Sequence, residues 1–237
     1  MQQENAKDLK SEILRNNTVV FTEEVHKINL DGLLLASFIK LKKGERFLDL
    51  GSGNGIIPLW LSDRGFKGES VAVELQPDAV NLIKEAVLAN SIEKFSVIHQ
   101  DLRSFSSETK FDAVSCNPPY FSLNGGKSAS DPARAAAREE LTTGISDVAA
   151  AAARNLKQHG RLYCCYPPAR LQSLFSALQQ FGFSPKRIRF CRYSPDKKPW
   201  TALFEARLNA REGLTVMNDF IVRRCGEKTS EYLEITE

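Results

Sequence analysis

The feature that most restricts the fold is an alternation of short apolar segments with longer amphipathic segments, which begins at residue 46. Short runs rich in Val, Ile, Leu and Phe predict strands, and apolar residues at helical spacing predict helices between them. Strands that alternate with helices of this length favour the α/β class, with a parallel sheet covered on both faces. We expect strands at 46–50, 70–74, 95–98, 111–116, 161–165, 188–193 and 201–208, and helices at 56–64, 77–90, 145–156 and 169–181.

Smaller segments flank this alternating region. We divide the chain into an N-terminal extension at 1–40, a central domain at 41–211 and a C-terminal hairpin extension at 212–237. Residues 1–17 are polar and predict an arm or a short helix, and a helical run follows at 30–39. Residues 213–222 and 232–235 predict the strands of the terminal hairpin. The long Gly-, Ser-, Ala- and Arg-rich stretch at 122–143 predicts a functional loop, because such loops are uncommon in compact domains.

Composition limits the possible classes of protein. The 237 residues are 42% hydrophobic and 26% charged, as in ordinary globular domains. No apolar run is long enough to span a membrane, and the N-terminus lacks the apolar core of a signal peptide, so we expect a cytoplasmic protein. Five cysteines without a Cys-x-x-Cys pair, and three scattered histidines, predict reduced core thiols and no metal site.

A glycine-rich turn follows the first strand of the alternation. The sequence Asp49-Leu50-Gly51-Ser52-Gly53-Asn54-Gly55 runs from a strand into a helix, and its glycines permit a tight turn close to a ligand. The spacing is Gly-x-Gly-x-Gly, which differs from the pattern of dinucleotide sites. Asp49 would repel a pyrophosphate but suits a ligand with a cationic amino group.

Acidic residues end the next two strands. Glu74 is placed to accept both hydroxyls of a ribose, and Asp101 could accept from an adenine amine, with Leu75 and Leu102 beside them. An adenosine joined to a cationic amino acid describes S-adenosylmethionine. In this order the motifs resemble the class I methyltransferases, and the resemblance implies a Rossmann-like, seven-stranded sheet.

The fourth strand leads into Asn117-Pro118-Pro119-Tyr120-Phe121. The Asn117 oxygen and the Pro118 carbonyl can accept from an NH2 group whose lone pair is delocalised, and can hold it in line with a methyl donor. Pro119 stiffens the turn, and Tyr120 offers a face on which a planar substrate can stack. We therefore assign Asn117, Pro118, Pro119 and Tyr120 to catalysis, and Asn117 also to the cofactor site.

This tetrapeptide resembles the signature of methyltransferases that act on adenine, guanine or glutamine amino nitrogens. The residues alone leave open guanine N2 in rRNA, a release-factor glutamine, and an inactive RNA-binding protein. Only about 45 residues precede the glycine motif, which disfavours the helical domain of the release-factor enzymes.

Charge distribution favours RNA. Residues 154–224 hold 14 Lys and Arg against 4 Asp and Glu, a net charge of +10. Cations mixed with aromatic residues fit phosphates and bases. The candidate RNA-binding residues are Phe121, Lys127, Arg134, Arg138, Lys186, Arg187, Arg189, Arg192, Lys197 and Lys198.

Further motifs narrow the resemblance to one family. They include Asp31-Gly32-Leu33-Leu34-Leu35-Ala36, the Ala-Arg-Glu-Glu stretch at 137–140, and Ser194-Pro195-Asp196-Lys197-Lys198-Pro199. The chain resembles the tRNA1(Val) adenine-37 N6-methyltransferases over most of its length. One departure is Glu139, where members of that family often have His. The resemblance implies S-adenosylmethionine as cofactor, adenine in tRNA as substrate and a monomeric enzyme.

Overall fold

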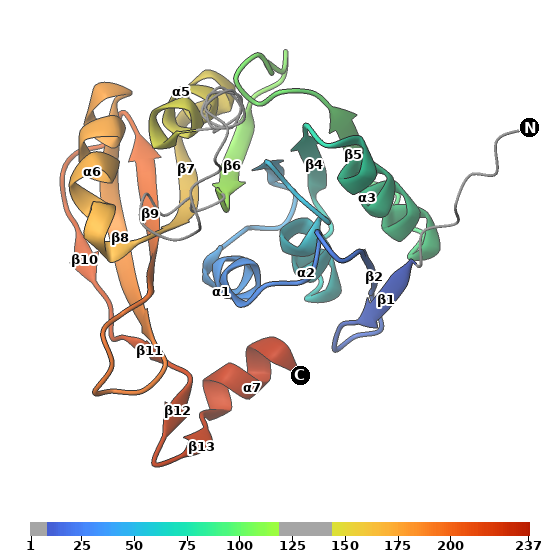
Figure 1. Ribbon diagram of the computed structural model, residues 1–237. Helices are drawn as coiled ribbons and strands as arrows, with labels where there is room; N and C mark the ends of the chain where they lie inside the picture. Colours follow the sequence, from blue (N-terminus) through green and yellow to red (C-terminus); the bar gives the residue numbers. More distant parts are fainter. Residues whose placement is uncertain (1–8, 119–143) are drawn as a thin grey trace, which may run out of the picture.

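The computed structural model describes residues 9–118 and 144–237 and shows one large mixed sheet between two layers of helices (Figure 1). Seven long strands form this sheet in the order β5-β4-β3-β6-β7-β9-β8. Every neighbouring pair is parallel except the two pairs that β9 makes with β7 and β8. The strands are β3 (Arg46–Leu50), β4 (Glu69–Glu74), β5 (Phe95–His99), β6 (Phe111–Cys116), β7 (Leu156–Tyr166), β8 (Phe183–Arg192) and β9 (Thr201–Leu208). The predicted fold class is confirmed.

Alternation of side chains along each strand places one core on each face of the sheet. In β3, Phe47 packs into one hydrophobic cluster, and Leu48 and Leu50 pack into the other. The first cluster is closed by α1 (Leu30–Phe38), α2 (Ile56–Asp63) and α3 (Pro77–Ala89). The second is closed by α5 (Ile145–Asn155) and α6 (Leu171–Gln180), which follows the short 3-10 turn η1 (Pro168–Arg170). No described helix is long and apolar enough to cross a bilayer.

The N-terminal extension differs from the prediction. Instead of an arm or a helix, residues 10–13 form strand β1 (Lys10–Ile13), which pairs antiparallel with β2 (Val19–Thr22). Asn17 supports the turn with a left-handed backbone conformation (φ 69°). All of β1 is exposed, so it has no apolar alternation from which a strand could be read.

The C-terminal extension also needs a correction. The expected strand at 232–235 lies inside helix α7 (Ser230–Thr236), because Thr229 caps the helix by accepting from the Tyr232 backbone N–H. The described hairpin is shorter and lies earlier, between β12 (Arg223–Arg224) and β13 (Glu227–Lys228). Before it, β10 (Thr215–Val216) and β11 (Phe220–Ile221) extend the main sheet by running parallel to β8.

Strands β7 and β8 are longer than expected. β7 begins five residues earlier than predicted and includes the exposed polar residues at 157–159. β8 begins at Phe183, and Pro185 is accommodated where the pairing with β9 shifts register. The polar residues at the start of β7 and the proline near the start of β8 are untypical of strands, so the sequence pattern did not predict these strand ends.

Candidate cofactor and acceptor site

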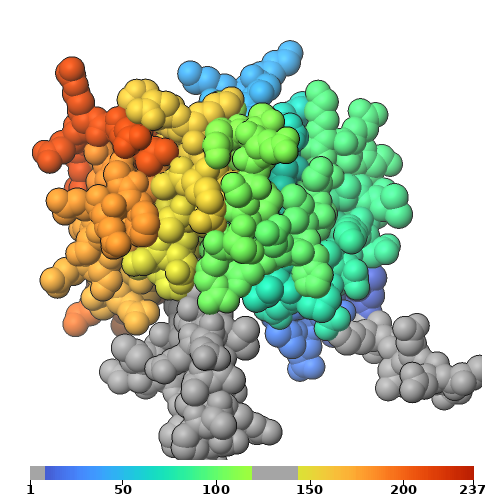
Figure 2. Space-filling model, turned by 90° about the horizontal axis from the view of Figure 1, so that it is seen from above, coloured from blue at the N-terminus to red at the C-terminus, as the bar shows by residue number. Residues whose placement is uncertain are grey.

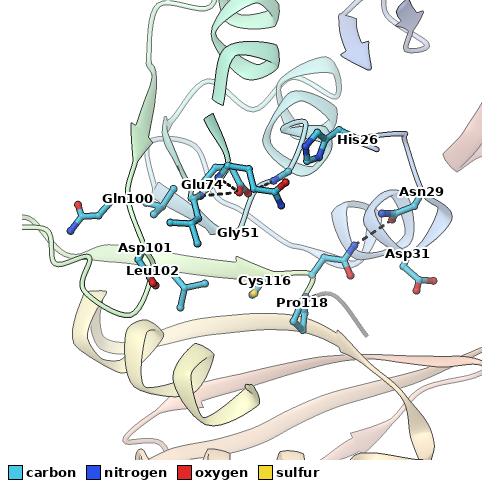
Figure 3. A pocket seen from close by; sticks show the side chains of 15 residues that line it. His26, Asn29, Asp31, Gly51, Glu74, Gln100, Asp101, Leu102, Cys116 and Pro118 are labelled. Carbon is cyan, nitrogen blue, oxygen red and sulfur yellow. Dashed lines mark hydrogen bonds between the residues drawn. The ribbon is translucent and has the colours of Figure 1, made fainter. Parts of the chain in front are cut away.

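A cavity of about 460 Å³ opens at the carboxyl edge of the sheet, where ligands bind in open α/β folds. Figure 3 shows Asn29 and Asp31 at one end, Gln100 and Asp101 at the other, and Gly51 and Glu74 between them. The full lining is His26, Asn29, Asp31, Gly51, Gly53, Val73, Glu74, Leu75, Gln76, Gln100, Asp101, Leu102, Cys116, Asn117 and Pro118. The volume lies in the range usual for small-molecule and cofactor sites.

The glycine-rich turn forms one wall of this cavity. The backbone N–H groups of Gly51 and Ser52 donate to the Val73 carbonyl at 2.8 and 3.2 Å, which folds the turn over the end of β4. Gly51 and Gly53 have left-handed φ values of 66° and 57°, which explains why the turn needs glycine. Asn54 and Gly55 lie behind the turn, away from the cavity lining, and Gly55 precedes α2.

Glu74 is a buried carboxylate of the lining that backbone N–H groups hold in place. One of its oxygens accepts from the Gly53 N–H at 2.8 Å, and the other accepts from the Leu75 and Gln76 N–H groups at 2.8 Å each. Glu74 is buried, and its hydrogen bonds within the described residues all come from backbone N–H groups. The remaining acceptor site, on Oε2, suits a hydroxyl group of a ligand.

Asp49 does not line the cavity. It is buried under the glycine-rich turn, where its two oxygens accept from the hydroxyls of Ser52 and Ser115. Burial raises the pKa of Asp49 to about 7, against the lowering effect of the Ser115 and Ser52 hydrogen bonds. The structure thus places Asp49 as a support for the turn and not in contact with the cavity.

Asp101 and Leu102 line the end of the cavity opposite Asn29 (Figure 3). Arg103 binds the Asp101 carboxylate through its guanidinium at 2.6 Å and its backbone N–H at 2.8 Å, which lowers the pKa of Asp101. Leu102 is buried and faces Gly51, with its Cδ2 atom 3.9 Å from where a Cβ on that glycine would lie. This end therefore combines an apolar wall with a carboxylate that stays ionised.

Asn117 and Pro118 follow β6 and line the other end. The Asn117 Nδ2 donates to the Asn29 Oδ1 at 3.3 Å, and the Asn117 Oδ1 accepts from the Cys165 thiol at 2.8 Å. The Asn29 Oδ1 also accepts from the Gly32 N–H at 2.7 Å and so caps α1. These bonds fix which face of the Asn117 amide is presented. Pro119 and Tyr120, also assigned to catalysis, lie outside the described residues.

Several lining residues were not predicted from the sequence. His26, Asn29 and Asp31 come from the segment before and at the start of α1, and Gln100 follows β5. Asn29 did carry a local signal, because an Asn directly before a helical run is a favoured N-cap. Its contact with Asn117 spans 88 positions and has no such signal.

The candidate RNA-binding residues fall into separate places. Lys186 and Arg187 lie at the start of β8 and line a second cavity, of about 530 Å³, at the amino edge of the sheet. Arg187 pairs with the buried Glu205 at 2.7 Å. Arg189 and Arg192 also have carboxylate partners, and Lys197 and Lys198 are exposed after the end of β8. Phe121, Lys127, Arg134 and Arg138 lie outside the described residues.

Within the described parts of the chain, no group of three or more His, Cys, Asp or Glu side chains could hold a metal ion. Cys116, Cys164 and Cys191 are thiols without a disulfide, and burial raises the pKa of each.

Comparisons of sequence and of structure with known proteins both find methyltransferases. Residues 12–168 match the family model of the methyltransferase small domain. Curated relatives named tRNA1(Val) (adenine(37)-N6)-methyltransferase include one from Aeromonas hydrophila, 34% identical over 60% of each chain. Another, from Tolumonas auensis, is 34% identical over 68% of each chain.

Among solved structures, a predicted O-methyltransferase from Agrobacterium tumefaciens superposes with a TM-score of 0.70 at 19% identity. The superposition covers 87% of this chain and 95% of that one. At this identity the likeness establishes the fold.

Proposed function

This chain belongs to the methyltransferase small-domain family and groups with the tRNA1(Val) (adenine(37)-N6)-methyltransferases, and from this premise we propose its reaction. It transfers a methyl group from S-adenosylmethionine to N6 of adenosine 37 in tRNA1(Val). The observation that carries the proposal is the placement of Asn117 and Pro118 in the same cavity as Glu74 and the glycine-rich turn. The relatives' names support adenine in tRNA over guanine or glutamine.

The lining fits S-adenosylmethionine, which supplies an electrophilic methyl group when bound. Glu74 would accept from a ribose hydroxyl through Oε2, which accepts one backbone N–H and keeps one acceptor site, whereas Oε1 already accepts from two backbone N–H groups. Leu102 would pack against the adenine, and Asp101 and Gln100 offer polar groups at the same end of the cavity (Figure 3). Gly51 and Gly53 would hold the methionine part, and their turn is supported from behind by Asp49, Ser52 and Asn54.

The acceptor amine binds at the Asn117 end. The Asn117 Oδ1 and the Pro118 carbonyl accept from its two N–H bonds and hold the nitrogen in line with the methyl group. Positive charge develops on this nitrogen as the new bond forms, so acceptors aimed at it stabilise the transition state more than the bound substrate. Tyr120, Pro119 and Phe121 complete this end in the proposal.

The tRNA substrate follows from the family relatives and from the arrangement of charge. Figure 2 shows the orange and red C-terminal part, which includes the basic segment, on the side opposite the green part that carries α3 and β5. The basic segment reaches the cavity at one point, where the Trp200 indole N–H donates to the Asp31 Oδ1 at 2.8 Å. Lys127, Arg134, Arg138, Lys197 and Lys198 are proposed phosphate contacts, and we propose a cytoplasmic monomer with its catalytic domain at 41–211.

The test is transfer of labelled methyl groups to tRNA from a strain that lacks this protein, followed by nucleoside analysis. We expect N6-methyladenosine, and we expect no transfer to tRNA from the strain that contains the protein. Asn117→Ala should abolish transfer and leave S-adenosylmethionine binding nearly unchanged by calorimetry. N2-methylguanosine, or methyl incorporation into release factors, would refute the adenine assignment.

A further inference from the structure

A short loop at residues 193–200 joins β8 to β9 at the same edge of the sheet as the cofactor cavity. Its backbone is held by internal bonds. The Lys197 N–H donates to the Ser194 carbonyl at 3.0 Å, and the Arg192 guanidinium donates to the Lys197 carbonyl at 2.7 Å. The Trp200 N–H closes the loop on the Cys191 carbonyl at 3.1 Å. Side chains on this loop are thus presented from a fixed backbone.

Tyr193 begins the loop and is unusually open for a tyrosine. Its side chain is 60% exposed, whereas Tyr163 and Tyr166 are buried. The ring contacts the edge of the Trp200 ring, with centroids 6.1 Å apart and planes at 60°. This contact fixes the ring from one side, and most of its surface stays available to a partner.

Trp200 joins this ring pair to the cavity. Its indole N–H donates to the Asp31 Oδ1 at 2.8 Å, and Asp31 lines the cavity next to Asn29 (Figure 3). Asn29 in turn contacts Asn117, where the acceptor amine is proposed to bind. The exposed tyrosine is therefore joined through Trp200 to Asp31, which lies at the acceptor end of the cavity.

The same loop carries cations that are not held by firm ion pairs. Lys197 lies 4.0 Å from Asp196, and both side chains are about 70% exposed (69% and 74%), so solvent screens their attraction. Lys198 is exposed and has no ion-pair partner among the described residues. Arg189 and Arg192, by contrast, are bound to Glu231 and Asp219 at 2.6 and 2.5 Å.

We propose that Tyr193, braced by Trp200, is a stacking platform for an unpaired base beside the target adenosine, and that Lys197 and Lys198 bind its flanking phosphates. This inference rests on the proposed function and adds a second nucleotide subsite to it. An open aromatic face and exposed ammonium groups in one loop suit a single-stranded nucleotide, since every base has a face that can stack. Binding of a folded protein substrate would give no comparable reason for an exposed aromatic ring in the same loop as two exposed lysines.

The test measures binding of a fluorescently labelled, unmodified anticodon stem–loop to the full chain. Stacking of one base predicts that Tyr193→Ala weakens RNA binding about 5- to 150-fold. Tyr193→Phe keeps the ring and should stay within about 2-fold of wild type, whereas Tyr193→Leu should behave like the alanine variant. S-adenosylmethionine affinity should not change in any of them. Leu88→Ala is the matched control, because Leu88 is 76% exposed on α3 outside the cavity lining.

The lysines have a separate signature. If each of them binds a phosphate, Lys197→Ala and Lys198→Ala should each lower the slope of log affinity against log salt by about 0.7. Unchanged RNA binding in Tyr193→Ala, or equal weakening in Tyr193→Ala and Tyr193→Phe, would overturn the stacking platform. If wild type neither binds nor methylates any RNA, the proposed function itself fails, and that result is distinct from loss of the platform alone.

Discussion

The orientation of the Asn117 side-chain amide should depend on Asn29. An amide is nearly symmetric in shape, and only its hydrogen-bond partners decide whether oxygen or nitrogen faces the acceptor amine. Asn29 holds the Asn117 Nδ2 at 3.3 Å with the same oxygen that caps α1 through the Gly32 N–H at 2.7 Å. An amide turned over would present N–H groups to the substrate NH2, and donors would then oppose donors.

Three substitutions separate the two roles of this oxygen. Asn29→Asp keeps an acceptor for both bonds, Asn29→Ser keeps a cap but is too short to reach Asn117, and Asn29→Ala loses both. Loss of the cap costs about 1 kcal/mol. For a chain of this length this corresponds to a Tm lower by about 2–4 °C. At 3.3 Å the bond to Asn117 is long, so we assign it about 0.5–1 kcal/mol, or roughly a 2- to 5-fold loss in kcat.

The assay combines steady-state methyl transfer to tRNA, thermal unfolding and calorimetry with S-adenosylmethionine. We expect Asn29→Ser to lower kcat with Tm nearly unchanged, Asn29→Ala to lower both, and Asn29→Asp to preserve both. A kcat for Asn29→Ser equal to that of wild type would refute the orienting role. Weaker cofactor binding in Asn29→Ser would make this residue a cofactor contact instead.

Three more predictions concern the carboxylates and the glycine-rich turn. Glu74→Gln should weaken S-adenosylmethionine binding about 10- to 150-fold by calorimetry, because an amide nitrogen cannot accept from a hydroxyl or a backbone N–H. Because burial raises the pKa of Asp49 to about 7, the folded state binds more protons than the unfolded state between about pH 4 and 7. The contribution of Asp49 to the free energy of unfolding therefore falls as the pH rises through this range. Denaturant unfolding of Asp49→Asn at several pH values should show that this decline is gone. Gly55→Ala should lower the free energy of unfolding by about 2–4 kcal/mol, since φ is 78° and the new Cβ would lie 3.1 Å from Ile83. Gly44→Ala, at φ 82° with nothing within 4 Å, should cost only about 1–2 kcal/mol, and equal costs at the two sites would contradict the steric argument.

Much of the fold could be predicted from the sequence, because the apolar pattern that marks each strand or helix lies within that segment itself. Strands β3, β4 and β6 are short apolar runs between turn residues, and their order along the chain sets which carboxyl ends meet. Glu74 ends β4 and Asn117 directly follows β6, so their presence at one cavity followed from topology.

Residues placed by distant contacts could not be predicted in this way. Asn29 lies near Asn117 because α1 packs on β7 and β9, and β7 is the neighbour of β6 in the sheet. The bond between the two side chains spans 88 positions. Helix α7 is short, and its buried Ile235 packs in the hydrophobic cluster that also contains residues of α1 and α2, which are distant in the sequence. Asp49 shows the same limit, because its sequence position suggested ligand contact while Ser52 and Ser115 occupy both of its oxygens.

Charge is the property that the sequence describes least well, because a count cannot tell a cation bound within the protein from one available to a ligand. Arg189 and Arg192 belong to the most basic stretch, yet Glu231 and Asp219, 42 and 27 positions away, hold them. These two ion pairs attach the C-terminal extension to β8, so the arginines have a structural role that does not depend on RNA. Breaking such a pair to reach a phosphate would leave a partly buried carboxylate unpaired. Cations that follow a strand, such as Lys197 and Lys198, carry no such cost, and the contacts with phosphate are therefore expected in the loop after β8 and not along the strand.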